Sequence, residues 1–153
     1  GSCCIPISSI LNTSKKIYFD AIDPYTYEIA KKNISKYKLN SFINLKKYKI
    51  EEIAEKITGK YNFISANLPY IPNKEKIDKL KFEPKEALYA KDDGLYYIKK
   101  LINILPEIIK KEGVALIEID PKHSSYLKSV SSINVKIHKD YNNLERIAEV
   151  KIN

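Results

Sequence analysis

The chain has few of the residues that covalent and metal-centred functions require. Its 153 residues include only two cysteines, Cys3 and Cys4, and two histidines, His123 and His138. The cysteines are adjacent and have no other thiol to pair with, which fits neither a disulfide framework nor a zinc site and favours packing in a first helix. Neither histidine has a serine, cysteine or metal-spaced partner, so both are expected to be structural or exposed. We therefore expect a cytoplasmic protein whose function needs no metal.

Long apolar runs and arginine are also scarce. No run approaches the roughly 18 apolar residues that cross a bilayer, and no basic segment precedes the apolar start of the chain as in a signal peptide. The formal net charge is +8, but Arg146 is the only arginine, so nearly all of this charge is lysine. Because arginine is the usual residue for bidentate contacts to bases and phosphates, we interpret the charge mainly as a solvated surface. RNA or ribosomal surroundings are the alternative, and no membrane is expected.

Short apolar runs alternate with amphipathic stretches, a pattern typical of an α/β fold with a parallel sheet in one domain. Asp23 and Pro24 are placed to start a helix, Pro106 to kink one and Gly113 to end it. Strands are expected at 17–22, 42–46, 61–66 and 114–119, helices at 4–12, 24–36, 50–57, 94–111 and 121–130, and a closing antiparallel pair at 135–138 and 148–152.

The most informative stretch is Asn67-Leu68-Pro69-Tyr70, directly after the run at 61–66 that we interpret as a buried parallel strand. It is similar to the Asn-x-Pro-Tyr signature of methyltransferases that act on a planar nitrogen, either an amide or a base amino group. The lone pair of such a nitrogen is delocalised, which makes it a poor nucleophile. The side-chain oxygen of Asn67 and the carbonyl of Leu68 can each accept one N–H and aim the lone pair at a methyl donor, while Pro69 stiffens the backbone and Tyr70 offers a flat face.

A polar stretch over 71–93 follows this motif. Loops of about 20 residues inside a compact domain are usually functional, so we expect this one to cover the site. With the segments that follow, the chain resembles the peptide-chain release factor glutamine methyltransferases, the PrmC/HemK family, over nearly its whole length. The matching segments are Gly1-Ser2-Cys3-Cys4-Ile5, Asp23, Asn33, Asn67 to Ile71, Phe82-Glu83-Pro84 with Ala87-Leu88, Asp93-Gly94-Leu95, Glu118-Ile119 and Asp140 with Arg146.

The resemblance implies a Rossmann-like, S-adenosylmethionine-dependent methyltransferase fold, mostly parallel with a C-terminal antiparallel hairpin. It implies a cofactor site at Gly1, Ser2, Asp23 and Asn67, in which Asp23 holds the ribose hydroxyls. Asp23 can cap the following helix at the same time. Tyr48 would stack on adenine, or else is a surface tyrosine.

The resemblance also implies the reaction and the substrate. Asn67, Leu68, Pro69 and Tyr70 are the implied catalytic and substrate-binding residues, and Glu83 either lines the pocket or lies in solvent. The substrate would be the side-chain amide of a glutamine in a release factor, and the products methylglutamine and S-adenosylhomocysteine. No metal is needed for this transfer. Asp93 is expected to cap the helix that follows it.

Several features depart from the family pattern. The first strand and the small N-terminal helical domain are missing, so residues 1–153 are expected to be a partial catalytic domain. The missing strand would lie between the strands that end at Asp23 and Asn67, and its loss should leave a gap and an exposed edge. Cys3 stands where glycine is usual, Leu68 replaces the first proline but keeps its carbonyl, and His123 stands where glutamine is common.

Two alternatives stay open. The first is a DNA or RNA methyltransferase that uses the same tetrapeptide on the amino group of adenine, in keeping with the positive charge. The second is a truncated, inactive fragment that binds cofactor weakly.

Overall fold

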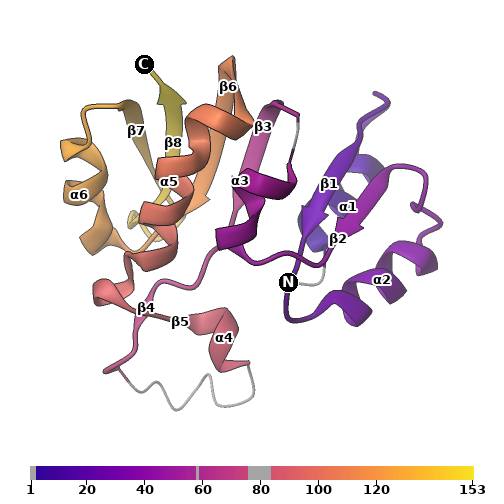
Figure 1. Ribbon diagram of the computed structural model, residues 1–153, viewed down its shortest axis with the longest axis horizontal. Helices are drawn as coiled ribbons and strands as arrows, with labels where there is room; N and C mark the ends of the chain where they lie inside the picture. The colour runs from indigo at the N-terminus through magenta and orange to yellow at the C-terminus, as the bar shows by residue number, and fades with distance from the viewer. Residues whose placement is uncertain (1–2, 58, 76–83) are drawn as a thin grey trace. The chain divides into compact units, whose positions relative to one another are not determined.

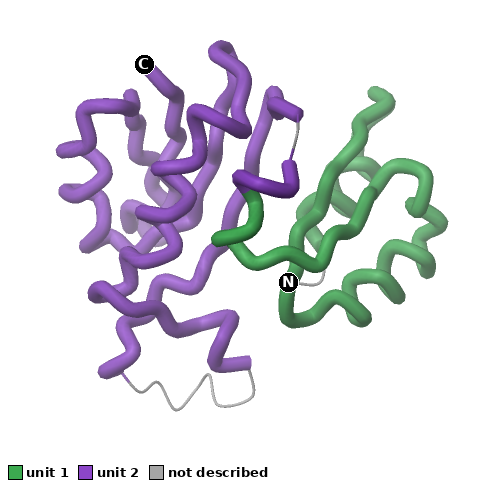
Figure 2. Tube along the Cα trace, viewed as in Figure 1, with its two compact units in different colours: residues 1–53 green, residues 54–153 purple. Residues whose placement is uncertain are grey.

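The computed structural model describes residues 3–57, 59–75 and 84–153 (Figure 1). These residues form two compact units, Gly1–Ile53 and Ala54–Asn153, called unit 1 and unit 2 (Figure 2). In the part of the chain that the structure describes, unit 1 contains a two-stranded sheet, and unit 2 contains a four-stranded and a two-stranded sheet. Among the described residues, none of the helices is long and apolar enough to cross a membrane.

Unit 1 is a small parallel α/β layer. Its elements are α1 (Cys4–Leu11), β1 (Phe19–Ile22), α2 (Tyr27–Lys36), β2 (Ile43–Lys46) and the 3₁₀ turn η1 (Ile50–Glu52). β1 and β2 pair in parallel, with Phe19 opposite Ile43 and Ile22 opposite Lys46. Parallel strands need a crossover, and α2 supplies it. One core joins the two helices to the strands, through buried Ile7, Ile34, Leu39 and Ile43.

The helix predicted to begin at Pro24 begins three residues later, at Tyr27, and its N-cap is Thr26. The physical reason is a turn built on Asp23. The carboxylate of Asp23 accepts the backbone N–H of Tyr25 at 3.1 Å and that of Thr26 at 2.7 Å. Asp23 therefore caps the turn before α2, and the prediction that it caps the helix itself was wrong.

Unit 2 contains a mixed sheet with helices packed on it. The strands are β3 (Tyr61–Ala66), β6 (Ile109–Glu118), β7 (Ile133–Lys139) and β8 (Glu145–Ile152), in the order β3-β6-β8-β7. β3 and β6 are parallel, whereas β8 runs antiparallel to β6 and β7, which confirms the predicted closing pair. Helices α5 (Tyr96–Ile108) and α6 (Ser124–Ser129) lie in unit 2, with the 3₁₀ turn η4 (Pro121–His123) before α6, and the boundary between the units falls within α3 (Ile53–Lys56).

The core of unit 2 lies between α5 and the sheet. The apolar residues of α5 recur every three or four positions and are buried, as the spacing predicts. They pack against β6. The most completely buried large side chains of this core are Ile98, Leu105, Ile109, Ile117, Ile119, Leu127 and Val150.

β3 is parallel, as predicted, but it is not buried. Among the residues that the structure describes, it lies at an edge of the four-stranded sheet, next to β6. Its side chains are partly or largely exposed, and Phe63 is 48% exposed. An apolar run predicts a fully buried strand only if the sheet continues on both sides. For this reason the prediction of burial was wrong.

The boundary between α5 and β6 also differs from the prediction. The helix was expected to continue to Lys111 and to end at Gly113, but it ends at Ile108, and Gly113 lies within β6. Pro106 lies in the last turn of α5, where it cannot donate a backbone hydrogen bond. A Cβ on Gly113 would lie 3.0 Å from the carbonyl oxygen of Tyr61 and 2.9 Å from that of Lys110. The glycine therefore permits close packing of backbone where the β3–β6 register shifts.

The stretch predicted as a long loop over 71–93 contains short regular elements. β4 (Ile71–Pro72) pairs in parallel with β5 (Tyr89–Ala90), and α4 (Lys85–Leu88) leads into β5. The 3₁₀ turn η3 (Asp92–Gly94) follows and leads into α5. The two ends of the stretch are thus joined by the backbone pairing of β4 with β5.

Candidate functional site

The Asn67–Tyr70 segment begins where β3 ends. Ala66, the last residue of β3, pairs with Ile117 of β6, so the segment leaves the sheet at the carboxyl end of two parallel strands. Asn67 is exposed, and the three residues after it are partly buried. β4, which begins four residues after Asn67, pairs with β5. Ligands of open α/β sheets bind beyond the carboxyl ends of the strands, so this is the expected edge for a site.

Gly94 packs directly against the backbone of this segment. A Cβ at Gly94 would lie 2.0 Å from the carbonyl oxygen of Tyr70 and 2.9 Å from its carbonyl carbon. Gly94 also has φ +93°, which disfavours any other residue. The Asp93-Gly94-Leu95 match therefore has a structural reason here: only glycine lets η3 lie against Tyr70.

The other end of Tyr70 is held by β6. Its hydroxyl donates to Oε1 of Glu118 at 3.0 Å. Burial, followed by the negative charge and hydrogen bond of Glu118, raises the pKa of the Tyr70 phenol above its ordinary value. The phenol therefore keeps its proton and remains a donor. Tyr70 is thus held at two points, at its carbonyl by Gly94 and at its hydroxyl by Glu118. These two contacts orient its ring.

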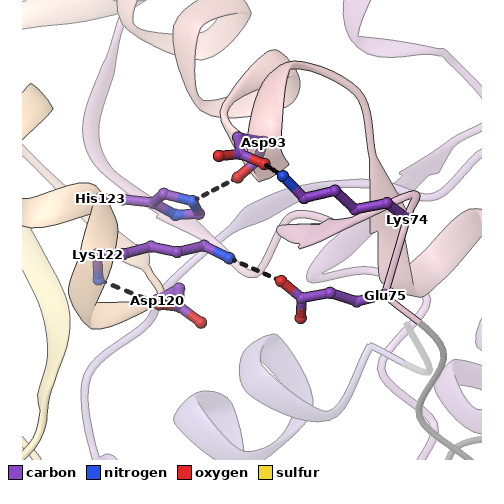
Figure 3. Close-up of polar contacts among 6 residues, drawn as sticks. All are labelled: Lys74, Glu75, Asp93, Asp120, Lys122 and His123. Carbon is purple, nitrogen blue, oxygen red and sulfur yellow. Dashed lines mark hydrogen bonds and ion pairs between the residues drawn. The ribbon is translucent and has the colours of Figure 1, made fainter.

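Ionic and hydrogen-bonded contacts surround η3 (Figure 3). Lys74, just after β4, pairs with the carboxylate of Asp93 at 2.8 Å, and Nε2 of His123 lies 3.1 Å from the carbonyl oxygen of the same residue. Lys122 reaches Glu75 at 3.4 Å. The Lys74–Asp93 pair is exposed and contributes little stability. His123, in contrast, is 1% exposed.

The expected cap at Asp93 is not formed. No side chain caps α5, whose N-cap is Leu95, and Asp93 instead pairs with Lys74. Asp92 rather than Asp93 reaches the helix, through Lys99 at 2.6 Å. The prediction for Asp93 was therefore wrong, because a left-handed turn separates it from the first turn of α5.

In unit 1, Asp23 follows β1 and is 5% exposed. Burial tends to raise its pKa, and hydrogen bonds from the Thr26 hydroxyl, at 2.6 Å, and from the Thr26 amide are among the interactions that lower it; the pKa lies below its ordinary value. Asp23 is a carboxylate at neutral pH. Its backbone N–H donates to the carbonyl of Lys46 at 3.0 Å, which ties the ends of β1 and β2 together.

The other residues predicted for the cofactor site are placed in part. Tyr48 is partly buried two residues after β2, so it shares the carboxyl edge of this sheet with Asp23. Cys3 has φ +59° and packs partly buried against the core, close enough to Asp23 for its charge to raise the pKa of the thiol, after burial itself. Glycine at this position would adopt that φ without strain. Gly1, Ser2 and Glu83 lie outside the described residues.

Glu118 and His123 are the residues of this region to which the sequence assigned no role in the site. The position of Glu118 at the end of a strand parallel to β3 was the one available signal. For His123 no signal was available, because its partner is a backbone carbonyl. Across the described ranges, no three His, Cys, Asp or Glu side chains group as metal ligands.

Known proteins resemble this chain in sequence and in fold. No protein-family model matches it. The release factor glutamine methyltransferase of Borreliella burgdorferi is 30% identical, over 99% of this chain and 51% of that protein. The protein of the same name from Mycoplasma mycoides subsp. mycoides is 35% identical, over 78% of this chain and 44% of that protein. The chain thus spans about half the length of these curated relatives.

Solved structures show the same fold at low sequence identity. The catalytic domain of hMettl16, in complex with MAT2A 3′UTR hairpin 1, aligns with a TM-score of 0.69 and 17% identity, over 99% of this chain and 60% of that one. The ribosomal protein L11 methylase of Lactobacillus delbrueckii subsp. bulgaricus aligns with a TM-score of 0.66 and 17% identity, over 100% and 66%. These likenesses confirm the Rossmann-like methyltransferase fold. By sequence, the chain resembles the release factor glutamine methyltransferases over most of its own length, and it spans about half of theirs.

Proposed function

We propose that this chain carries the methyl-transfer site of an enzyme that methylates the side-chain amide nitrogen of a glutamine in a peptide-chain release factor. Asn67 accepts one amide N–H through its side-chain oxygen, and the carbonyl of Leu68 accepts the other. Two fixed acceptors hold the nitrogen with its lone pair directed out of the amide plane. Tyr70 packs on the amide plane, and Pro69 restricts the turn.

The observation that carries this proposal is the fixation of the segment at Tyr70. Gly94 supports the Tyr70 carbonyl and Glu118 accepts from its hydroxyl, whereas Asn67 is exposed at the end of β3. Acceptors that are held in place before the substrate binds need little reorganisation during the reaction. The names of the relatives from Borreliella and Mycoplasma support glutamine as the residue that is modified.

Unit 1 has groups that fit S-adenosylmethionine. Asp23 is a carboxylate at the carboxyl end of β1, suited to accept from ribose hydroxyls, and Tyr48 presents an aromatic ring after the neighbouring strand. When bound, S-adenosylmethionine would supply a methyl group on a cationic sulfur. A bond between the methyl carbon and the amide nitrogen would form as the S–CH₃ bond breaks, with release of S-adenosylhomocysteine and loss of a proton from the nitrogen to water. The acceptors at Asn67 and Leu68 orient the amide for this transfer.

The test is transfer of a labelled methyl group from S-adenosylmethionine to a purified release factor. Asn67→Ala should lower kcat by about 100-fold or more, the scale on which one fixed polar contact to a transition state acts. Asn62→Ala is the matched control, since Asn62 is an exposed asparagine of β3, the strand that Asn67 follows, and its side-chain oxygen accepts from Lys110 at 3.1 Å. Full activity of Asn67→Ala would refute the assigned role.

The second candidate is transfer to an adenine amino group in RNA or DNA, favoured by the net charge of +8. An adenine amino group is also a planar nitrogen with two N–H donors, so Asn67 and Leu68 suit it equally well. The same assay with RNA in place of release factor separates the two. Methylated RNA with unmodified release factor would decide for this candidate. A folded chain that binds no S-adenosylmethionine would instead indicate that residues 1–153 alone are inactive.

A further inference from the structure

We propose that His123 is a positioning residue for the Asn67–Tyr70 segment, which it holds through the Asp92–Gly94 turn. It is not one of the residues predicted to accept the amide or to hold the cofactor. It acts on the carbonyl of Asp93 and on Gly94, and Gly94 in turn supports the carbonyl of Tyr70. Its consequence for catalysis depends on the proposed function, whereas its effect on the segment does not.

The turn that His123 contacts is in an unfavourable backbone conformation. Asp92, Asp93 and Gly94 have φ angles of +56°, +55° and +93° in succession. L-residues rarely adopt positive φ, and consecutive residues do so only where surrounding contacts impose it. The turn makes backbone hydrogen bonds from Gly94 to Lys91 at 3.1 Å and from Leu95 to Asp92 at 2.9 Å. These bonds close the turn but do not fix it against the sheet.

The side chains of the two aspartates cannot supply that fixation alone. The carboxylate of Asp93 pairs with Lys74 where the two side chains are 66% and 74% exposed, and the Asp92–Lys99 pair is also exposed. Exposed ion pairs contribute little because water screens them. The contact from His123 differs, because its ring is almost completely buried. A hydrogen bond away from water is both stronger and more costly to leave unmade.

The geometry determines which nitrogen of His123 carries the proton. A carbonyl oxygen only accepts, so Nε2, at 3.1 Å from the Asp93 oxygen, must be the N–H donor. Nδ1 is buried and has no partner among the described residues. A second proton there would place an unpaired charged donor in the interior, which is strongly unfavourable. His123 is therefore the neutral Nε2–H form.

The ring also acts by its shape. Its Cε1 lies 3.0 Å from the position that a Cβ on Gly94 would occupy. Gly94 is thus enclosed between the imidazole and the Tyr70 carbonyl, with no space for another atom. Removing the ring opens one side of this contact, so the turn and the Tyr70 carbonyl can both move.

The first test compares His123→Leu with His123→Gln in the full 153-residue chain. Leucine fills similar space but cannot donate, whereas glutamine has an N–H that can reach the Asp93 carbonyl. In His123→Leu the amides of Gly94 and Leu95 should exchange with solvent about tenfold faster, as expected for loss of one buried hydrogen bond, and the carbonyl carbon resonance of Tyr70 should shift. His123→Gln should restore most of the slow amide exchange and most of the original Tyr70 carbonyl resonance. Unchanged exchange and an unchanged Tyr70 resonance in His123→Leu would overturn the proposal, as would glutamine behaving like leucine.

A second measurement needs no variant and therefore holds even if His123→Leu does not fold. Nitrogen-15 spectra of the unmodified chain at neutral pH should show His123 protonated at Nε2 only. A proton on Nδ1, alone or in addition, would contradict the assigned contact.

The third readout is methyl transfer. His123→Leu should lower kcat about tenfold or more, and His123→Gln should recover most of it. KM for S-adenosylmethionine should change much less, because Asp23 and Tyr48, which are predicted to hold the cofactor, belong to unit 1. A fall in cofactor binding with kcat unchanged would overturn the positioning role. If the unmodified chain transfers no methyl group, the proposed function fails, and the exchange and nitrogen-15 measurements still decide the role of His123.

Discussion

Replacing Gly94 by alanine tests the contact on which the site depends. The added Cβ would lie 2.0 Å from the Tyr70 carbonyl oxygen, 2.9 Å from its carbonyl carbon and 3.0 Å from Cε1 of His123. The nearest atoms belong to backbone and to a buried ring, and neither can rotate away as a long side chain would. Either the turn or the Tyr70 backbone must move by about 1.4 Å to restore an ordinary contact of 3.4 Å.

Two terms contribute to the cost of this substitution. An L-residue at positive φ costs about 1–2 kcal/mol, and Gly94 has φ +93°. Overpacking of a fixed site by one carbon costs about 1–3 kcal/mol more. We therefore expect the free energy of unfolding to fall by about 2–5 kcal/mol, a large part of the 5–15 kcal/mol typical of a whole domain.

Urea unfolding of Gly94→Ala and of Gly59→Ala provides the measurement and its control. Gly59 has nothing within 4 Å of an added Cβ and no positive φ, so its alanine variant should be neutral or about 0.4–1 kcal/mol more stable. If Gly94→Ala instead relaxes locally, the loss of stability is smaller, but the Tyr70 carbonyl resonance moves and methyl transfer falls. A loss below about 1 kcal/mol together with an unmoved Tyr70 resonance would refute the packing argument.

Three further predictions concern single groups. Because the pKa of Asp23 is lowered in the folded chain, Asp23→Asn should reduce the free energy of unfolding by about 1 kcal/mol above pH 5. This difference from the unmodified chain should vanish as the pH falls below the ordinary pKa of 3.8. A difference that persists at pH 2 in acid-titrated unfolding would contradict this. A double-mutant cycle of unfolding free energies with Tyr70→Phe and Glu118→Ala should give a coupling energy of about 1 kcal/mol. Simple additivity of the two changes would mean that the 3.0 Å hydrogen bond from Tyr70 to Glu118 is not formed. Iodoacetamide at pH 8 should modify exposed Cys4 well before Cys3, because burial and then the charge of Asp23 raise the pKa of the Cys3 thiol. Peptide mass mapping that finds Cys3 modified first would contradict this order.

The sequence predicted the elements whose residues reflect local rules. The periodic apolar residues of α5, the apolar run of β3 and the closing β7–β8 pair each carry their own signal, and all three elements are present. The Asn67–Tyr70 motif was correctly placed at the end of a parallel strand.

Features that depend on a distant neighbour could not be predicted in the same way. Whether β3 is buried depends on the strand beside it, so its apolar run did not reveal that Phe63 is 48% exposed. The helix end was misplaced because Ile108 and Ile109 fit the apolar spacing of a helix and of a strand alike. Gly113 was taken for a helix end, but what requires a glycine there is the carbonyl of Tyr61, about 50 residues earlier in the chain.

Most of the residues predicted to hold the cofactor belong to unit 1, and those predicted to bind the amide belong to unit 2, with Asn67 predicted for both. The role of Asp23 can therefore be tested separately from the fixation of Tyr70. Asp23 and Tyr48 belong to unit 1, whose core is formed by its own helices and strands, and Asn67 and Tyr70 belong to unit 2. A substitution at Asp23 should therefore weaken binding of S-adenosylmethionine and leave the Tyr70 carbonyl resonance in place, whereas Gly94→Ala should do the reverse. If either variant changed both readouts equally, the two sets of residues would not be independent, and the fixation of Tyr70 by unit 2 alone would be an insufficient account of the site.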